Sequence, residues 1–449
     1  MSFPGAILMG AQKRLLPVSV PYRFFLGAAA GHVLAWLLLA LAADQVPGYG
    51  GGPGPVLAVV HALTLGVFAA TAMGASFQML PVATGQELVA LWPCRLAFWL
   101  LFPGALVLLA GFHLGKPGVM AIGAGTVSLA FLPFAWVVGD LLWKTRGILL
   151  VLRFHAWTAL AALGGLALLG LALIADYDHG FLPDRSSAGL AHLILAVFGF
   201  MGFLAFGYSH ILVPMFALSP ASDPGRAKLG YGLALAALLA GVSGALSGIS
   251  VLLVGAAILG LAATGVHLHQ MRLSLKTGMR KNLGLSFVLV KTAWGLLPLT
   301  LTVGGLAAAG GGGGRMVALF GFLALFGWLL TFLTGILQRI VPFLASMNAG
   351  KGKGGRTPRL SELAAEGPLK VHAACHFAAL ALGAVGIGGG WPAVIQGAAS
   401  IGLAGAAAFF WFVADVYRRL LRSRAQQQHQ ATETETDVLP PTAHPADPA

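Results

Sequence analysis

The sequence carries little charge for its length. Of its 449 residues, 9% are Asp, Glu, Lys or Arg, whereas a soluble domain carries about a quarter. Hydrophobic residues make up 58% of the chain, which leaves too few polar side chains to cover a globular surface. This composition excludes a soluble globular enzyme. It also excludes disorder, except at the ends of the chain.

Several catalytic and redox signatures are also absent. The sequence contains no Walker loop, no dinucleotide fingerprint after a strand, no HExxH and no GxSxG. The two cysteines, Cys94 and Cys375, lie in or beside apolar segments and do not predict a disulfide framework. Acidic residues within the apolar segments are limited to Asp140 and Asp415. The buried carboxylate chain of a proton-driven carrier is therefore not expected.

What the sequence does contain is a series of apolar stretches, each about 20 residues long or longer, the length that crosses a bilayer as a helix. We therefore predict an all-α polytopic membrane protein with twelve spans. The predicted limits are 24–43, 55–81, 91–113, 117–142, 150–175, 189–216, 227–246, 249–268, 283–309, 316–343, 369–387 and 392–417.

The basic residues predict the orientation of these spans. Of the 27 Lys and Arg, 22 fall in segments on one side of the predicted membrane, three on the other and two within spans. Because cytoplasmic loops carry the excess of Lys and Arg, both termini are expected in the cytoplasm of a bacterial-type inner membrane. The net charge of +13 is explained by this bias. Lipid is therefore the expected partner and nucleic acid is not.

Three segments lie outside the spans. Residues 1–23 are expected to be a retained cytoplasmic segment, because they lack the apolar core of a signal peptide. The loop 346–368 is basic and rich in glycine, and is expected to be flexible and to rest on anionic headgroups, with partner binding as the alternative. The tail 425–449 is rich in Gln, Thr, Pro and Ala and is predicted to be disordered.

The second, sixth and tenth spans share one pattern of two glycines and a proline. In each span the glycines are eight residues apart and the proline follows seven residues later. These residues are Gly66, Gly74 and Pro81; Gly199, Gly207 and Pro214; and Gly327, Gly335 and Pro342. The pattern predicts three four-helix units, 24–142, 150–275 and 283–420, related by pseudo-threefold symmetry. Glycines at this spacing lie near one helix face and permit close packing, so these three spans are expected to be the inner helices.

Histidine is the residue type most informative about chemistry, because an imidazole inside a membrane is costly and usually faces a partner or cofactor. His61 and His192 lie in the outer parts of the second and sixth spans and are candidate ligands. His61 precedes its first glycine by five residues and His192 by seven, so the two need not face one site. His32, His113 and His155 are expected to be structural, and His267 and His269 to be solvated at the interface.

A second candidate site lies in the eleventh span. His372, Cys375 and His376 are spaced by three and four residues, which places them on one helix face as a possible metal site. Solvation of this face at the membrane interface is the alternative. Arg339, near the inner end of the tenth span, is a candidate partner for a haem propionate, and snorkelling to the interface is the alternative there.

The second span also resembles a known family. Its segment VHALTLGVFAATAMGASFQMLPVATG matches the register of the NnrS family, twelve-span haem- and copper-containing proteins linked to nitric oxide stress, at His61, Gly66, Gly74, Pro81 and Gly85. More distantly, the arrangement resembles the catalytic subunit of the haem-copper oxidases. The resemblance implies an oxidase-like fold, a b-type haem and copper as cofactors, and respiratory-chain or cytochrome partners.

These observations lead to one function hypothesis and two alternatives. The leading hypothesis is a membrane-embedded haem- or copper-binding protein with a redox, metal-handling or nitric oxide stress role. Because the seventh and tenth spans contain no histidine, full oxidase or nitric oxide reductase activity is not expected. The alternatives are a cofactor-free transporter of a metal ion or small solute, and an assembly partner of a respiratory oxidase.

Overall fold

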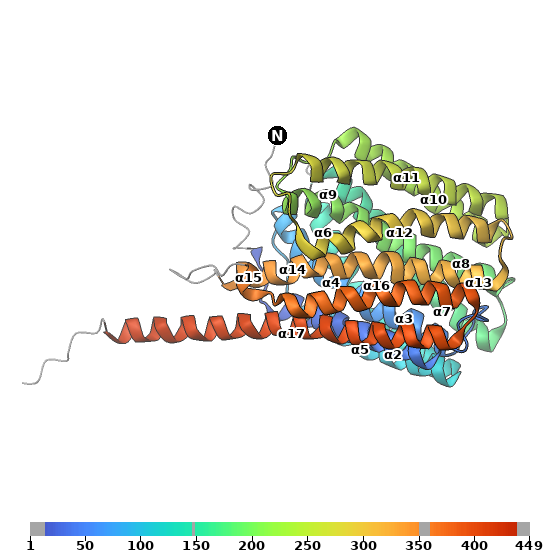
Figure 1. Ribbon diagram of the computed structural model, residues 1–449, viewed down its shortest axis with the longest axis horizontal. Coiled ribbons are helices and arrows are strands. Elements are labelled where there is room, and N and C mark those ends of the chain that lie inside the picture. Colours follow the sequence, from blue (N-terminus) through green and yellow to red (C-terminus); the bar gives the residue numbers. More distant parts are fainter. Residues whose placement is uncertain (1–13, 146–148, 350–359, 438–449) are drawn as a thin grey trace, which may run out of the picture.

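The computed structural model describes residues 14–145, 149–349 and 360–437. Within these residues, twelve helices are long and apolar enough to cross a membrane, which confirms the predicted number of spans. They run roughly along one direction and form a single bundle (Figure 1). The protein is therefore an all-helical membrane protein.

Three of the spans are divided into segments, and the other nine are single helices. The single helices are α2 (Ser19–Leu41), α5 (Trp92–Leu114), α6 (Pro117–Lys144), α7 (Leu150–His179), α10 (Pro224–Ser247), α11 (Ser250–Thr277), α12 (Gly284–Ala308), α16 (Glu366–Gly389) and α17 (Pro392–Asp437). The divided spans are α3 (Pro55–His61), η2 (Ala62–Ala69) and α4 (Ala70–Thr84); α8 (Arg185–Ile194), η3 (Leu195–Gly202) and α9 (Phe203–Ala217); and α13 (Gly313–Phe322), η4 (Leu323–Leu330) and α14 (Thr331–Ala349). A short helix, α15 (Leu360–Leu363), precedes α16.

The middle segments of the three divided spans, η2, η3 and η4, are π-helical. Each is eight residues long. They begin at residues 62, 195 and 323, so Pro81, Pro214 and Pro342 each follow 19 residues after the start of the segment. The three segments contact one another. Within the most apolar 18 residues of each span, the buried share is highest in the second and tenth, at 72% and 67%, and is 50% in the sixth, as in the first and fourth. The expectation that these spans lie at the centre agrees with these contacts.

The repeated glycines bring each central helix against the helix that begins its predicted unit. A methyl group on Gly74 would lie 2.7 Å from Phe24 of α2, and one on Gly335 would lie 2.9 Å from the carbonyl oxygen of Ser286 in α12. A methyl group on Gly207 would lie 2.8 Å from the Cβ atom of His155 in α7. Only glycine allows these helices to approach so closely without a local shift.

The remaining helices surround the central three. The pairs α5–α6, α10–α11 and α16–α17 pack as hairpins. Between them, α6 contacts α7, α11 contacts α12, and α17 contacts α2, so that the surrounding helices close on themselves. At this last contact the ring of Tyr22 in α2 stacks on that of Tyr417 in α17, with 4.9 Å between ring centres. The first span therefore begins beside the place where the last span leaves the bundle.

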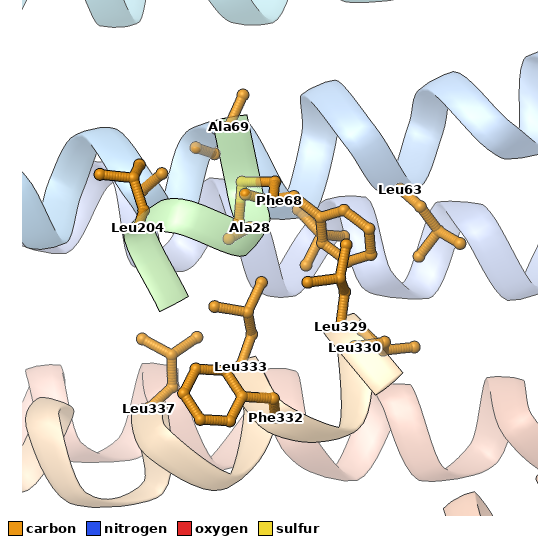
Figure 2. Packing of buried hydrophobic residues seen from close by; sticks show 14 of the residues in the cluster. Ala28, Leu63, Phe68, Ala69, Leu204, Leu329, Leu330, Phe332, Leu333 and Leu337 are labelled. Carbon is orange, nitrogen blue, oxygen red and sulfur yellow. The ribbon is translucent and has the colours of Figure 1, made fainter. Parts of the chain in front are cut away.

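Apolar side chains fill the space where the central helices meet. Leu63 and Phe68 of η2 face Leu329 and Leu330 of η4 there, with Leu204 of α9 nearby (Figure 2). All five are at most 6% exposed. The centre of the bundle is therefore a packed core, with leucine and phenylalanine at the positions where a polar pathway would have to run.

The structure corrects two expectations about segments outside the spans. Residues 425–437, expected to be disordered, continue α17 as a helix that projects beyond the bundle (Figure 1), because Ala, Gln and Glu are good helix formers. Residues 346–349, expected to begin a flexible loop, belong to α14. Here Asn348 is buried and its backbone oxygen accepts a hydrogen bond from Arg424 at 3.3 Å. Residues 1–13, 350–359 and 438–449 lie outside the described residues.

Candidate functional site

The two candidate ligands of the central helices lie beside each other. The ring centres of His61, at the end of α3, and His192, in α8, are 6.4 Å apart, and the ring planes differ by 23°. Both rings are partly buried. The difference in register along the two helices therefore does not separate them, because each helix is rotated by its own packing.

A backbone carbonyl holds each of these rings. Nδ1 of His61 donates to the carbonyl oxygen of Leu57 one turn earlier, at 3.0 Å. Nδ1 of His192 donates to the carbonyl oxygen of Leu166 in α7, at 2.8 Å. A carbonyl only accepts hydrogen bonds, so both Nδ1 atoms carry the proton. Nε2 of each neutral ring therefore keeps a free lone pair.

The surroundings of the pair are aromatic on one side and tightly packed on the other. The ring of Phe112 in α5 lies 4.7 Å from that of His61, measured between centres. Gly170 of α7 lies against His192, and a methyl group there would come within 3.1 Å of Cε1 of the imidazole. The position of the His192 ring thus depends on α7 through both Leu166 and Gly170.

Polar residues of the loop before α8 fix the start of this helix. Asp184 accepts hydrogen bonds from the backbone nitrogen and the hydroxyl group of Ser186, at 2.9 and 2.7 Å, and from the hydroxyl group of Ser187, at 2.5 Å. The hydroxyl groups of Ser187 and Ser186 are the main reasons that the pKa of Asp184 is lowered. Nearby, Arg185 forms an ion pair with the buried carboxylate of Asp176 at 3.0 Å. These contacts tie α8 to the end of α7.

Arg339 lies away from this pair. Its Nε atom donates to the hydroxyl group of Ser286 at 2.9 Å, and a second nitrogen donates to the carbonyl oxygen of Leu283, both near the start of α12. In the shared register, Phe322 corresponds to His61, and Arg339 follows Phe322 by 17 residues. Arg339 therefore lies several helical turns further along its span than the level that corresponds to His61, and its hydrogen bonds go to the start of α12.

The second candidate cluster contains a residue that the sequence pattern does not predict. The ring centres of His372 and His376 in α16 are 5.4 Å apart, and His32 of α2 lies 5.6 Å from His372. All three rings are at most 1% exposed. Cys375 is only partly buried and packs against α17, where a methyl group on Gly405 would lie 2.8 Å from its Cβ atom. Spacing within one helix cannot reveal the contribution of His32.

A third group of histidines contains His155, expected to be structural, His267, expected to be interfacial, and a further residue, His210. His155 of α7, His210 of α9 and His267 of α11 lie together, with ring centres 6.0 Å apart for the first two and 5.2 Å apart for the last two. His267 also stacks on Phe206 at 4.0 Å. Three different helices bring these rings together, so no spacing in the sequence indicates the group.

Two further observations concern where a metal ion or a larger ligand could bind. In the described part of the chain, no group of three or more His, Cys, Asp or Glu side chains could hold a metal ion as they stand. A cavity of about 390 Å³ is lined by residues of α8, η3 and α9, of α10, α11 and α12, and of α13 and η4, and its lining is apolar apart from Thr264. Neither His61 nor His192 lines this cavity.

Comparison with known proteins does not assign the chain to a family. No family model matches the sequence. No curated protein matches it either.

Proposed function

We propose that this chain is a membrane-embedded haem-binding protein in which His61 and His192 are the two axial ligands. The observation that carries the proposal is the pair of neighbouring imidazoles, with 6.4 Å between ring centres and 23° between ring planes. If haem is bound here, one nitrogen of each imidazole would hold its iron.

The hydrogen bonds of the two rings also favour this proposal. A metal-bound histidine commonly donates its other N–H group to a carbonyl or carboxylate, which fixes the tautomer and the ring orientation. His61 and His192 both make such a bond, to Leu57 and Leu166. When bound, haem iron supplies a one-electron redox centre, which fits a role in electron transfer or in protection against nitric oxide.

We further infer that the bundle consists of three pseudo-symmetric four-helix units with an oxidase-like arrangement. Three π-helical segments at one register, central helices packed on the first helix of each unit, and the closed order of the surrounding helices all support this inference. The ligand pair then joins the inner helices of the first and second units. The excess of Lys and Arg favours cytoplasmic termini in a bacterial-type membrane, with a cytochrome or respiratory-chain protein as electron partner.

The packed centre of the bundle weighs against the transporter alternative. A carrier of ions or polar solutes needs a polar route from the outer histidines to the inner end. Leu329 and Leu330, both fully buried, occupy the middle of the tenth span instead, and Phe68 lies beside them (Figure 2).

The proposal is tested by the visible spectrum of the full chain, purified in detergent from cells supplied with haem. We expect a Soret band with a bis-imidazole, low-spin spectrum, and loss or a clear shift of this spectrum in both His61→Ala and His192→Ala. His179→Ala is the matched control, because His179 is exposed at the end of α7, and it should leave the spectrum unchanged. A wild-type protein without a Soret band, or an unaltered spectrum in both variants, would contradict the proposal.

A further inference from the structure

The buried cluster of His32, His372 and His376 contains three nitrogen atoms without a hydrogen-bond partner. Nδ1 of His32, Nε2 of His372 and Nδ1 of His376 are buried and have no hydrogen-bond partner. A buried polar atom without a partner costs roughly 1–3 kcal/mol. The ring of His372 lies 5.6 Å from that of His32 and 5.4 Å from that of His376, so the three unpartnered atoms belong to one cluster of buried rings.

The hydrogen bonds of His372 and His376 determine what their free nitrogens can offer. Nδ1 of His372 donates to the carbonyl oxygen of Gly405 at 3.2 Å, so its Nε2 atom carries a lone pair. His376 contacts the hydroxyl group of Thr331 through Nε2 at 2.7 Å. That hydroxyl group donates its single proton to the carbonyl oxygen of Phe326 at 3.0 Å. His376 is therefore the donor to Thr331, and its Nδ1 atom also carries a lone pair.

His32 differs from these two rings. The indole N–H group of Trp36 donates to Nε2 of His32 at 2.9 Å, so the proton of the neutral His32 ring is on Nδ1. In this tautomer His32 offers no free lone pair to a cation. The cluster therefore provides two electron-pair donors, on adjacent turns of α16, and the His32 ring lies edge-on to His372 beside them.

We propose that His372 and His376 bind one monovalent d¹⁰ ion of the Cu⁺ or Ag⁺ class, through Nε2 of His372 and Nδ1 of His376. Histidines four residues apart on a helix are a recurrent metal-binding pair. Zn²⁺ takes at least three protein ligands, and only two lone pairs are free here. This site is separate from the proposed haem site and does not depend on it.

The groups around the three rings also favour a monovalent ion, because none of the groups bonded to the rings carries a charge. The groups bonded to the three rings, which are Trp36, Thr331 and the carbonyl of Gly405, are neutral. The cost of transferring an ion into an apolar interior rises with the square of its charge. A divalent ion is therefore disfavoured at this cluster more strongly than a monovalent ion that accepts two imidazoles.

The test is a titration of the purified full chain with Ag⁺, which is redox-inert, followed by isothermal calorimetry. Cys94→Ser and Cys375→Ser together provide a background without competing thiols. In this background we expect one saturable equivalent of Ag⁺. His372→Ala and His376→Ala should each weaken it at least tenfold, and His113→Ala, on the exposed side of α5, should not change it.

X-ray absorption at the silver edge gives a second readout that does not depend on the variants. The wild-type chain with one equivalent of Ag⁺ should show two nitrogen neighbours and no sulfur. His372→Gln and His376→Gln replace the alanine variants if these fail to fold, as judged by their melting temperatures. A sulfur neighbour, loss of the equivalent on removing the thiols, or binding unaffected by either histidine overturns the proposal.

Discussion

At the scale of single residues, the buried histidines are defined by their hydrogen-bond partners rather than by their positions in the chain. His192 bonds to a carbonyl of α7, and His376 to a hydroxyl group of α14. Each bond fixes which ring nitrogen carries the proton and which keeps a lone pair. Chemistry at these residues therefore depends on neighbours that lie 26 and 45 residues away in sequence.

Gly170 offers a test of how far the His192 ring depends on its surroundings. In Gly170→Ala the new methyl group would lie 3.1 Å from the imidazole, so the ring has to shift by a few tenths of an ångström. We expect haem affinity to fall about tenfold, the lower end of the loss seen when a group that orients a metal ligand is changed. Haem titration of the apoprotein measures this.

The control for this variant is Gly164→Ala in the same helix, where nothing lies within 4 Å of the added methyl group. It should bind haem as the wild type does. Equal affinities for the two variants would mean that the His192 ring is not held by this contact.

At the scale of elements, the start of α8 depends on an ionised carboxylate. The hydrogen bonds to Asp184 lower its pKa below the ordinary value of about 3.9. Asp184 therefore stabilises the folded protein fully above pH 4, and this stabilisation is lost as the pH falls through its pKa in the folded state. Because α8 carries His192, the hydrogen bonds of Asp184 at the start of α8 also affect the position of His192.

Asp184→Ala should accordingly lower the melting temperature by a few degrees at pH 7, while the wild type and the variant converge as the pH falls through the lowered pKa of Asp184. Thermal unfolding of the detergent-purified proteins across this range measures the difference. Asp184→Ser keeps a hydroxyl group that can accept the same hydrogen bonds, so its melting temperature should lie between those of the wild type and Asp184→Ala. A difference that stays constant with pH would show that the charge of Asp184 is not responsible.

The contact between α2 and η2 is a second feature at this scale. A methyl group on Gly31 would lie 2.8 Å from the carbonyl carbon and oxygen of Gly66, and backbone atoms cannot rotate away. We expect Gly31→Ala to destabilise the protein by about 1–3 kcal/mol, measured by thermal or denaturant unfolding. Gly125→Ala in α6, with no atom within 4 Å, should be neutral or slightly stabilising.

At the scale of the whole molecule, stability depends on the core where the three π-helical segments meet. Lipid is as apolar as leucine, so burial of apolar area contributes little here and close packing contributes most. Leu329 is fully buried in this core, whereas Leu168 of α7 is 71% exposed on the outer surface.

Substituting each of these two leucines by alanine distinguishes the contribution of close packing to stability from that of hydrophobicity alone. Leu329→Ala should cost about 2–5 kcal/mol because it leaves a cavity among rigid helices, and the melting temperature should fall clearly. Leu168→Ala removes the same atoms from a surface that lipid can fill, and should have little effect. Equal losses would indicate that the centre of the bundle is not tightly packed.

Much of the architecture could be predicted from the sequence, whereas most of the site could not. Hydropathy indicates the twelve spans and the repeated glycines indicate the central three, because both are local patterns along one helix. The pairing of His61 with His192 could not be predicted, since their registers differ by two residues. His32 is likewise 340 residues from its neighbour His372, and no pattern within one helix connects them.

The sequence alone therefore determined that this chain is a membrane protein, how many times it crosses, and which helices carry the close-packing glycines. Each of these follows from the side chains of one segment in apolar surroundings. Only the tertiary structure decided which imidazoles lie beside each other, which of their nitrogens are free, and that Cys375 turns towards Gly405. These depend on the rotation and tilt of helices packed against several neighbours at once, and no single segment contains that information.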